Sequence, residues 1–222
     1  MILRLCLKCC RYVCSGPRIA IAFIPIVRYH GIQMGQAAWI WIGTWRFHAV
    51  CNYSKLERNG KYMEPGTLSS IFTVRRLQEK DTELIYNLCC KNKIFYQYHP
   101  PSPTREGILE DMAALPPGKD YKDKYYIGFF ENGVLAAIMD LILGYPEKDI
   151  AYIGLFMVDV GYQKKSIGSK IITECAGCLR MSGFRSIRLA VDRGNPQSNS
   201  FWKKNGFLVT GQTKYILMEL SL

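Results

Sequence analysis

The sequence predicts an α/β (α+β) fold in which helices flank one mixed, mostly antiparallel central β-sheet. Three apolar runs, at residues 125–130, 134–143 and 150–158, are separated only by short polar turns, which is typical of hairpin-linked strands. Two amphipathic runs, residues 167–182 and 195–205, alternate with further strands, as helices that cover a sheet do. From residue 71 the predicted order is β-α-α-β-β-β-α-β-α-β-β. Three hairpin-linked strands in a row argue against the alternative, a doubly wound nucleotide-binding sheet.

The part of the domain that precedes these three strands begins with a strand and a helix. Residues 71–77 alternate apolar and polar side chains, which is the period of a strand. Asp81 is a good N-cap for a helix at residues 82–91, because a carboxylate can accept hydrogen bonds from the first turn. Residues 94–101 are aromatic and end in two prolines, so we expect a loop or a short irregular segment there.

Turn and capping residues predict where the remaining helices and strands begin and end. Thr104 can cap a second helix, residues 105–115, which the following Pro-Pro-Gly sequence ends. Asn132 and Gly133 supply the positive φ angles that a tight hairpin turn requires. Gly183 ends the helix that starts at residue 167. The last three predicted strands are residues 186–191, 207–210 and 215–220.

Residues 1–62 differ from the rest of the chain. They contain nine Lys and Arg residues against one acidic residue, and so carry +8 of the net charge of +11. The apolar run at residues 19–27 is about half as long as a membrane span, and Pro25 interrupts it. We predict an N-terminal extension at residues 1–62, not part of the folded domain, and a domain at residues 63–222. An over-extended reading frame is the first explanation of the extension, and a peripheral membrane anchor is the second.

The cysteines and the charge of residues 63–222 exclude several classes of protein. This part of the chain is nearly neutral and has no basic stripe, so we expect no nucleic-acid partner. Nine cysteines, some of them adjacent, do not form a disulfide framework, and we expect a cytoplasmic protein. Cys175 and Cys178 fall within a helix and indicate core packing, while Cys6 and Cys9 lack the second half of a zinc site. We therefore expect no metal.

The loop between the strand at residues 150–158 and the helix at residues 167–182 has the features of a phosphate site. The first turn of a helix offers backbone N–H groups without a partner, and the helix dipole adds a partial positive charge. Small residues would let a phosphate approach the backbone, and lysines add positive charge. The small residues are Ser166, Gly168 and Ser169, and the lysines are Lys164, Lys165 and Lys170. The alternative is a lysine-rich loop before an ordinary surface helix.

Two motifs in this order resemble those of the GNAT N-acetyltransferase superfamily. The family's cofactor motif is Arg or Gln, two residues, Gly, one residue, then Gly or Ala. Here it reads Gln163-Lys164-Lys165-Ser166-Ile167-Gly168, with Ser166 in place of the first glycine. The second motif begins at Asn195, continues to the aromatic pair Phe201-Trp202, and ends at Gly206-Phe207. The resemblance covers about residues 71–222 and implies the GNAT fold.

The resemblance also implies acetyl-CoA as co-substrate and a set of residues that bind it. In the family a central strand splays from its neighbour, and the pantetheine arm lies in the gap. Phe156, Met157 and Val158 occupy that position, with the backbone N–H of Val158 as oxyanion donor, although all three could be plain core. The cofactor-binding residues implied are Phe156, Met157, Val158, Gln163, Lys164, Lys165, Ser166, Ile167, Gly168, Ser169, Asn195, Phe201 and Trp202. For Asn195 the alternative is a helix N-cap.

The acid and base of the reaction are less evident. The family often has Tyr at the position of Trp202, where the hydroxyl can protonate the leaving thiolate, but an indole N–H is no proton source at neutral pH. Asp140 is a charge within an apolar strand, so it is either paired in the structure or functional, and we take it as the candidate general base. The reserve candidates are Tyr98, His99 and Tyr145.

The expected function is transfer of an acetyl group from acetyl-CoA to a primary amine by direct attack. The acceptor amine, a small molecule or a protein, is not identified, and the oligomeric state is unknown. The alternative is a non-catalytic acyl-CoA-binding module of the same fold, because Ser166 and Trp202 depart from two usual family positions.

Overall fold

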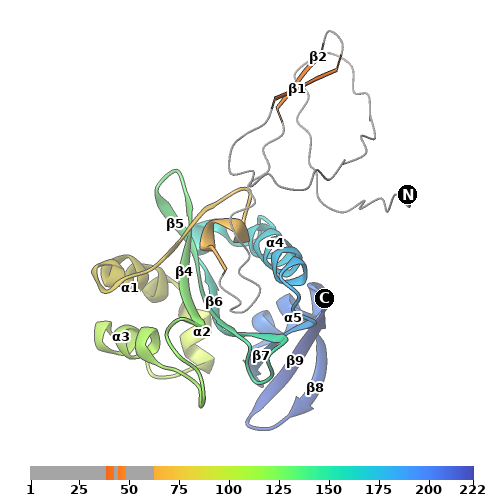
Figure 1. The fold of residues 1–222 in the computed structure, drawn as a ribbon. Coiled ribbons are helices and arrows are strands. Elements are labelled where there is room, and N and C mark those ends of the chain that lie inside the picture. Colours follow the sequence, from red (N-terminus) through yellow and green to blue (C-terminus); the bar gives the residue numbers. More distant parts are fainter. Residues whose placement is uncertain (1–38, 43–44, 49–62) are drawn as a thin grey trace. The chain divides into compact units, whose positions relative to one another are not determined.

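The structure, a computed structural model, describes residues 39–42, 45–48 and 63–222, and its main part is a seven-stranded β-sheet (Figure 1). The strand order is β3-β4-β5-β6-β7-β9-β8. Only β6 and β7 pair in parallel, and all other neighbours are antiparallel. The strands are β3 (Thr73–Arg76), β4 (Lys124–Glu131), β5 (Val134–Leu143), β6 (Ile150–Val158), β7 (Ser186–Asp192), β8 (Leu208–Gln212) and β9 (Tyr215–Ser221). The predicted mixed, mostly antiparallel sheet is confirmed.

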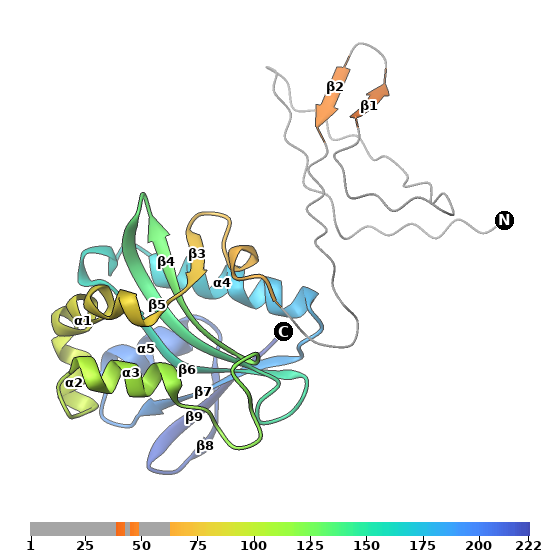
Figure 2. The same ribbon diagram turned by 60° about the vertical axis from the view of Figure 1, so that its left-hand side comes forward.

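The helices cover both faces of this sheet, with α1 to α3 on one face and α4 on the other (Figure 2). They are α1 (Thr82–Lys91), α2 (Lys93–Tyr98), α3 (Arg105–Ala113), α4 (Ile167–Met181) and α5 (Pro196–Lys204). A hydrophobic cluster lies between the sheet and the helices on each face. One cluster includes Ile171 and Trp202, and the other includes Ile85 and Ile108. The predicted hairpin turn is confirmed, since Asn132 and Gly133 have φ angles of 50° and 81°.

One predicted loop is a helix. Residues 94–101 were expected to be irregular, but Lys93–Tyr98 forms α2. Phe95 and Tyr96 pack against the cluster under α1 and α3, so tertiary packing stabilises a segment whose local sequence is not strongly helical. The helix ends at His99, immediately before two prolines that could not continue it.

Asp81 lies at the predicted N-cap of α1, but its side chain makes no capping hydrogen bond. The carboxylate instead accepts hydrogen bonds from both Arg75 Nη atoms at 2.8 Å and from the Gln78 backbone N–H at 2.8 Å. The Arg75 hydrogen bonds are the main reason that the pKa of Asp81 lies below its ordinary value. The buried carboxylate therefore ties β3 to the start of α1.

Asp81→Asn is expected to lower the free energy of unfolding by about 2 kcal/mol at pH 7, the scale of a buried hydrogen bond to a charged group. Because the folded-state pKa is lowered, this stability is present above the ordinary carboxyl pKa of about 4 and is lost as the pH falls through the folded value. Urea unfolding at pH 7 and pH 3 measures the difference. Glu83→Gln, which removes an exposed partner of Arg105, is the control with little effect. An equal deficit at both pH values would contradict this account.

The core extends back from β3 to Met63. Met63 and Leu68 are both buried, and the Met63 backbone N–H donates to the hydroxyl of Tyr125 at 2.9 Å. Cys178 of α4 lies 3.9 Å from the Met63 sulfur, and Cys175 is also buried, so the predicted packing role of this cysteine pair is confirmed. The boundary at residue 63 stays a prediction, because the residues just before it lie outside the described part of the chain.

Two short strands lie within the predicted N-terminal extension. β1 (Trp39–Ile42) and β2 (Trp45–His48) pair in antiparallel fashion as a sheet of their own. Aromatic and β-branched residues dominate both strands, and such residues favour pleated structure even where the alternation is too short to detect. The rest of the predicted extension lies outside the described residues, as do Cys6, Cys9 and Pro25. Among the described helices, none has the length and apolar character to cross a bilayer.

Candidate active site

The sheet opens where β6 and β7 part. Their parallel pairing runs from Ile150 to Ile153 on β6 and stops there, while β6 continues to Val158 and β7 to Asp192. On its other edge β6 stays paired with β5 as far as Val158, with a bulge near Gly154. The last part of β6 therefore has one edge without a neighbouring strand. This edge contains the three residues predicted to face the pantetheine arm.

A cavity of about 250 Å³ lies beside this open edge. It brings together every predicted cofactor residue except Lys165: Phe156, Met157, Val158, Gln163, Lys164, Ser166, Ile167, Gly168, Ser169, Asn195, Phe201 and Trp202. The other lining residues, which are not among the predicted cofactor-binding residues, are Asn92, Phe95, Tyr162, Gln197, Ser198 and Lys204. A smaller cavity of about 60 Å³ lies between β6 and β7 and shares Phe95, Phe156 and Trp202 with the first. Because the two cavities share lining residues they are adjacent, and together they are called the groove below.

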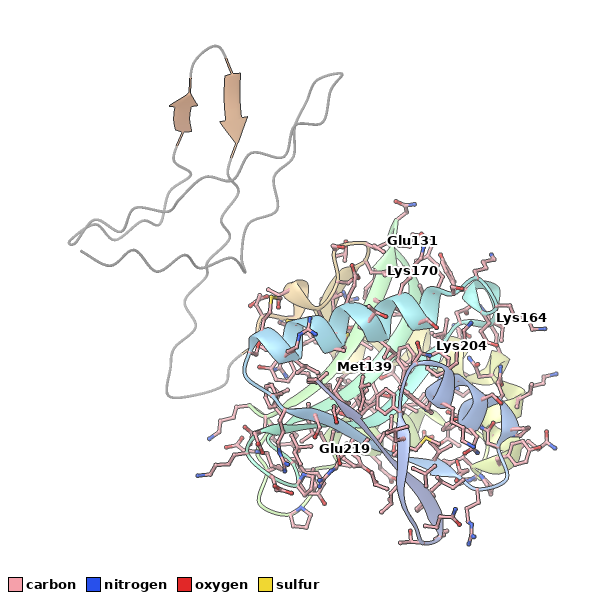
Figure 3. The ribbon with its side chains drawn as sticks, turned by 90° about the vertical axis from the view of Figure 1, so that its right-hand side faces the viewer. Glu131, Met139, Lys164, Lys170, Lys204 and Glu219 are labelled. Carbon is pink, nitrogen blue, oxygen red and sulfur yellow. The ribbon has the colours of Figure 1, made fainter. Side chains whose placement is uncertain are left out.

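The loop before α4 has the backbone conformation of an anion site. Lys164 and Ser166 have φ angles of 60° and 61°, in the left-handed region that favours glycine. Ser166 is the N-cap of α4 but makes no side-chain capping bond, so its hydroxyl does not compete for the first-turn N–H groups. Lys164 and Lys204 line the cavity, and Figure 3 shows both near the N-terminal end of α4. These donors fit a pyrophosphate.

Gln163 lines the cavity as predicted, and its side-chain amide is hydrogen-bonded within the protein, so its contact with a cofactor stays a prediction. Its Nε2 donates to the Val158 carbonyl at 2.9 Å and to Asn92 Oδ1 at 2.8 Å. Asn92 in turn donates to the carbonyls of Leu88 at 2.9 Å and Val158 at 3.3 Å. The two amides thus hold the end of β6 in place. The sequence gives no signal for Asn92, which is 71 residues from Gln163.

Asn195 and the aromatic pair form the wall of the groove opposite β6. Asn195 Oδ1 accepts the Ser198 backbone N–H at 3.0 Å, so its N-cap role is confirmed, and its contact with a cofactor stays a prediction. Trp202 is 6% exposed, with ring centroids 5.0 Å from Phe201 and 5.9 Å from Phe156. This wall is apolar and packed, which suits a thioester and its carbon chain.

Asp140, the candidate base, lines neither cavity. Its Oδ2 lies 2.8 Å from Lys124 Nζ, and both residues are buried. The same oxygen lies 2.8 Å from the place that a Cβ on Gly154 would occupy, so the carboxylate lies against the β6 backbone. Burial raises the pKa of Asp140, and Lys124 opposes the shift. The geometry favours a structural ion pair over a base that reaches the groove.

Among the reserve candidates, only His99 has an acidic partner at the groove. Its Nδ1 lies 3.1 Å from Oδ2 of Asp192, and Asp192 lines the smaller cavity. Tyr98 lies against the backbone at Gly194, where an added Cβ would be 3.1 Å from its ring. Tyr145 packs edge-on against Tyr152, with 5.6 Å between ring centroids, and lines neither cavity.

The splayed sheet and the open helix N-terminus beside it have the arrangement that the resemblance implies for an acetyl-CoA site. The profile of the Acetyltransferase (GNAT) family matches residues 86–207, more than half of the chain. The protein belongs to this family of acetyltransferases. A search of curated protein sequences finds no match.

Solved structures share the fold at low sequence identity. An acetyltransferase from Thermus thermophilus is 21% identical with a TM-score of 0.58, and the match covers 68% of this chain and 99% of that one. PaiA N-acetyltransferase from Thermoplasma acidophilum, in complex with coenzyme A, is 21% identical with a TM-score of 0.53 (67% and 98% covered). The GNAT domain of PAT from S. lividans is 16% identical with a TM-score of 0.52 (67% and 89% covered). At these identities the likeness shows the fold alone.

Proposed function

We propose that the protein transfers an acetyl group from acetyl-CoA to a primary amine by direct attack. The observation that carries this proposal is the groove of two adjacent cavities, which extends from the N-terminus of α4 along the unpaired edge of β6. The coenzyme A complex of PaiA N-acetyltransferase, a protein with the same fold, supports the choice of acetyl donor.

The proposed compartment is the cytoplasm. The cysteines of the described residues form no disulfide, which suits a reducing compartment. They are Cys89, Cys90, Cys175 and Cys178.

Three parts of the groove would hold acetyl-CoA. The loop at Lys164 and Ser166 would bind the pyrophosphate with backbone N–H groups, and lysine side chains would add positive charge. Phe156, Met157 and Val158 would pair with the amides of the pantetheine arm through their backbone, as an added strand pairs with a sheet edge. The bound molecule would supply an activated acetyl group, and the aromatic wall would keep water from it.

The chain's own groups define how the transfer proceeds. The backbone N–H at Val158 would stabilise negative charge on the acetyl oxygen, and the amides of Gln163 and Asn92 fix the position of that residue by bonding its carbonyl. Trp202 offers no acidic proton, so we assign no side-chain acid at this helix. The neutral amine would attack, and the departing thiolate would take its proton from the ammonium of the resulting intermediate or from solvent. A non-catalytic acyl-CoA-binding module remains the second candidate, because Ser166 and Trp202 are unusual at their positions.

Gly168→Leu is expected to abolish the thermal stabilisation that acetyl-CoA gives the wild-type protein. A Cβ at Gly168 would lie 3.0 Å from the Phe201 ring, so a longer side chain must enter the groove or displace its wall. Gly177→Leu is the matched control, because it makes the same change in the same helix at a position with open space. A wild-type shift in both variants would contradict the site.

The two candidate functions are separated by turnover. The assay follows release of the coenzyme A thiol from acetyl-CoA in the presence of a panel of primary amines. An acetyltransferase releases thiol with at least one amine and yields the acetylated product by mass spectrometry. Tight binding of acetyl-CoA with no amine-dependent release would favour the binding module.

A further inference from the structure

His99 and Asp192 form an imidazole–carboxylate pair that no step described above uses. His99 is the C-cap of α2, and Asp192 is the last residue of β7, 93 positions later in the chain. His99 Nδ1 lies 3.1 Å and 3.3 Å from the two carboxylate oxygens. The pair therefore connects the helical layer to the strand that parts from β6.

Asp192 lines the groove, and His99 lines neither cavity itself but lies beside two residues that do. Asp192 lines the smaller cavity, and it is the only carboxylate that lines either cavity among the described residues. Phe95 lines both cavities, and its ring centroid is 5.2 Å from that of His99. The imidazole thus contacts two residues that line the groove. It is also accessible, because 49% of the His99 side chain is exposed.

The chemistry of such a pair depends on which nitrogen faces the carboxylate. With Nδ1–H donating to Asp192, the neutral ring carries its lone pair on Nε2, which is the acceptor that a general base requires. Nε2 makes no hydrogen bond within the described residues. A carboxylate that holds an imidazole in one tautomer and stabilises the imidazolium is a recurring device for proton transfer.

We propose that His99, oriented by Asp192, is the general base that accepts a proton from the acceptor ammonium. This inference rests on the proposed amine acetylation. Asp140 is the rival, but it is buried and held by Lys124, whereas 49% of the His99 side chain is exposed. His99 would touch the amine, and Asp192 would act through His99 as a positioning residue.

The proton balance of the step is complete without another reactant. The ammonium loses one proton to Nε2 of His99, and the amine lone pair forms the new C–N bond. The C–S bond breaks, and its electron pair leaves with the thiolate, which takes the second nitrogen-bound proton. His99 then returns its proton to solvent, so each turnover yields the amide, the free thiol and one proton.

The test is a comparison of His99→Gln with the wild-type protein in the thiol-release assay. We expect the rate at pH 7 to fall by about 100-fold or more, the scale of lost general-base catalysis, while acetyl-CoA binding is unchanged. The pH–rate profile of the wild-type protein should contain an acid limb that the variant lacks, because the variant has no imidazole base. The charged groups that face His99 are Asp192 of β7 and Asp111 of α3, both acidic.

Further variants distinguish a catalytic role of His99 as a base from a purely structural role in which it only connects α2 to β7. Asp192→Asn should lower the rate less than His99→Gln, and the control Asp149→Asn, in a surface ion pair with Arg185, should not change it. An aromatic amine that is already neutral at pH 7 should restore most of the lost rate.

A His99→Gln protein that has lost thermal stability but keeps the wild-type rate and pH profile overturns the proposal. If the wild-type protein acetylates no amine, the proposed function itself fails, and this base with it.

Discussion

Lys124→Met is expected to lower the free energy of unfolding by about 3–5 kcal/mol at pH 7, the cost of leaving a buried charge without its partner. Lys124 Nζ lies 2.8 Å from Asp140 Oδ2, and the residues are 3% and 9% exposed. Asp140 Oδ1 has no hydrogen-bond partner within the described residues, so the lysine is the main compensation for the buried carboxylate. Urea unfolding of the variant and the wild-type protein measures the loss.

The pH dependence of this loss has a definite sign. Burial raises the pKa of Asp140 above its ordinary value, and Lys124 opposes that shift, so the lysine's removal raises the pKa further. A folded state with a raised carboxyl pKa binds the proton more tightly than the unfolded chain, and protonation then stabilises the fold as the pH falls. The deficit of Lys124→Met should therefore be smaller at pH 5 than at pH 7. A constant deficit would mean that lost packing of the lysine stem dominates.

The double variant Lys124→Met, Asp140→Leu is the matched control and also tests Asp140 as a base. Replacement of both partners by apolar residues should recover most of the lost stability, because no unpaired charge stays buried. If the pair is only structural, this variant should also keep amine acetylation within several-fold of wild type. A stable double variant with a rate down about 100-fold or more would return the role of base to Asp140.

Local signals account for the parts of the fold that the sequence predicted well. β5 and β6 have the predicted bounds, and α1 does too, because apolar periodicity and turn residues are properties of short segments. α2 was missed because Phe95 and Tyr96 are stabilised by a cluster contributed by other helices and strands. The sequence of residues 93–98 has no pattern that predicts this packing. The two prolines that follow it favour a loop.

In the site, too, local sequence signals could be recognised, whereas contacts between distant parts of the chain could not. The loop that we propose for the pyrophosphate could be recognised because its residues are contiguous and directly precede a helix, which the structure has at Ile167–Met181. The side-chain pairings could not, because they join residues distant in sequence: Lys124 with Asp140, Gln163 with Asn92, and His99 with Asp192. These contacts decide which groups are free for chemistry. They hold Asp140 and the amide of Gln163 in contacts within the protein, and they place His99 beside Asp192, which lines the groove.

Trp202→Ala is expected to lower the free energy of unfolding by about 3–5 kcal/mol and to weaken acetyl-CoA binding. Trp202 is 6% exposed, lines both cavities, and packs 4.9 Å from Phe207 and 5.0 Å from Phe201 between ring centroids. Truncation therefore removes core packing and the wall of the groove together. Leu179→Ala separates the two effects, since Leu179 is fully buried but lines neither cavity, and should cost stability alone.

Trp202→Phe completes the test, because it keeps an aromatic ring and removes the indole N–H. If that N–H donates no proton in the reaction, the variant should bind acetyl-CoA nearly as well as wild type and keep most of the rate at saturating amine. Calorimetric titration with acetyl-CoA and steady-state thiol release supply the two measurements. Normal affinity combined with a rate about 100-fold lower would show that the indole takes part in the chemistry, and the assignment of no side-chain acid at α5 would then be wrong.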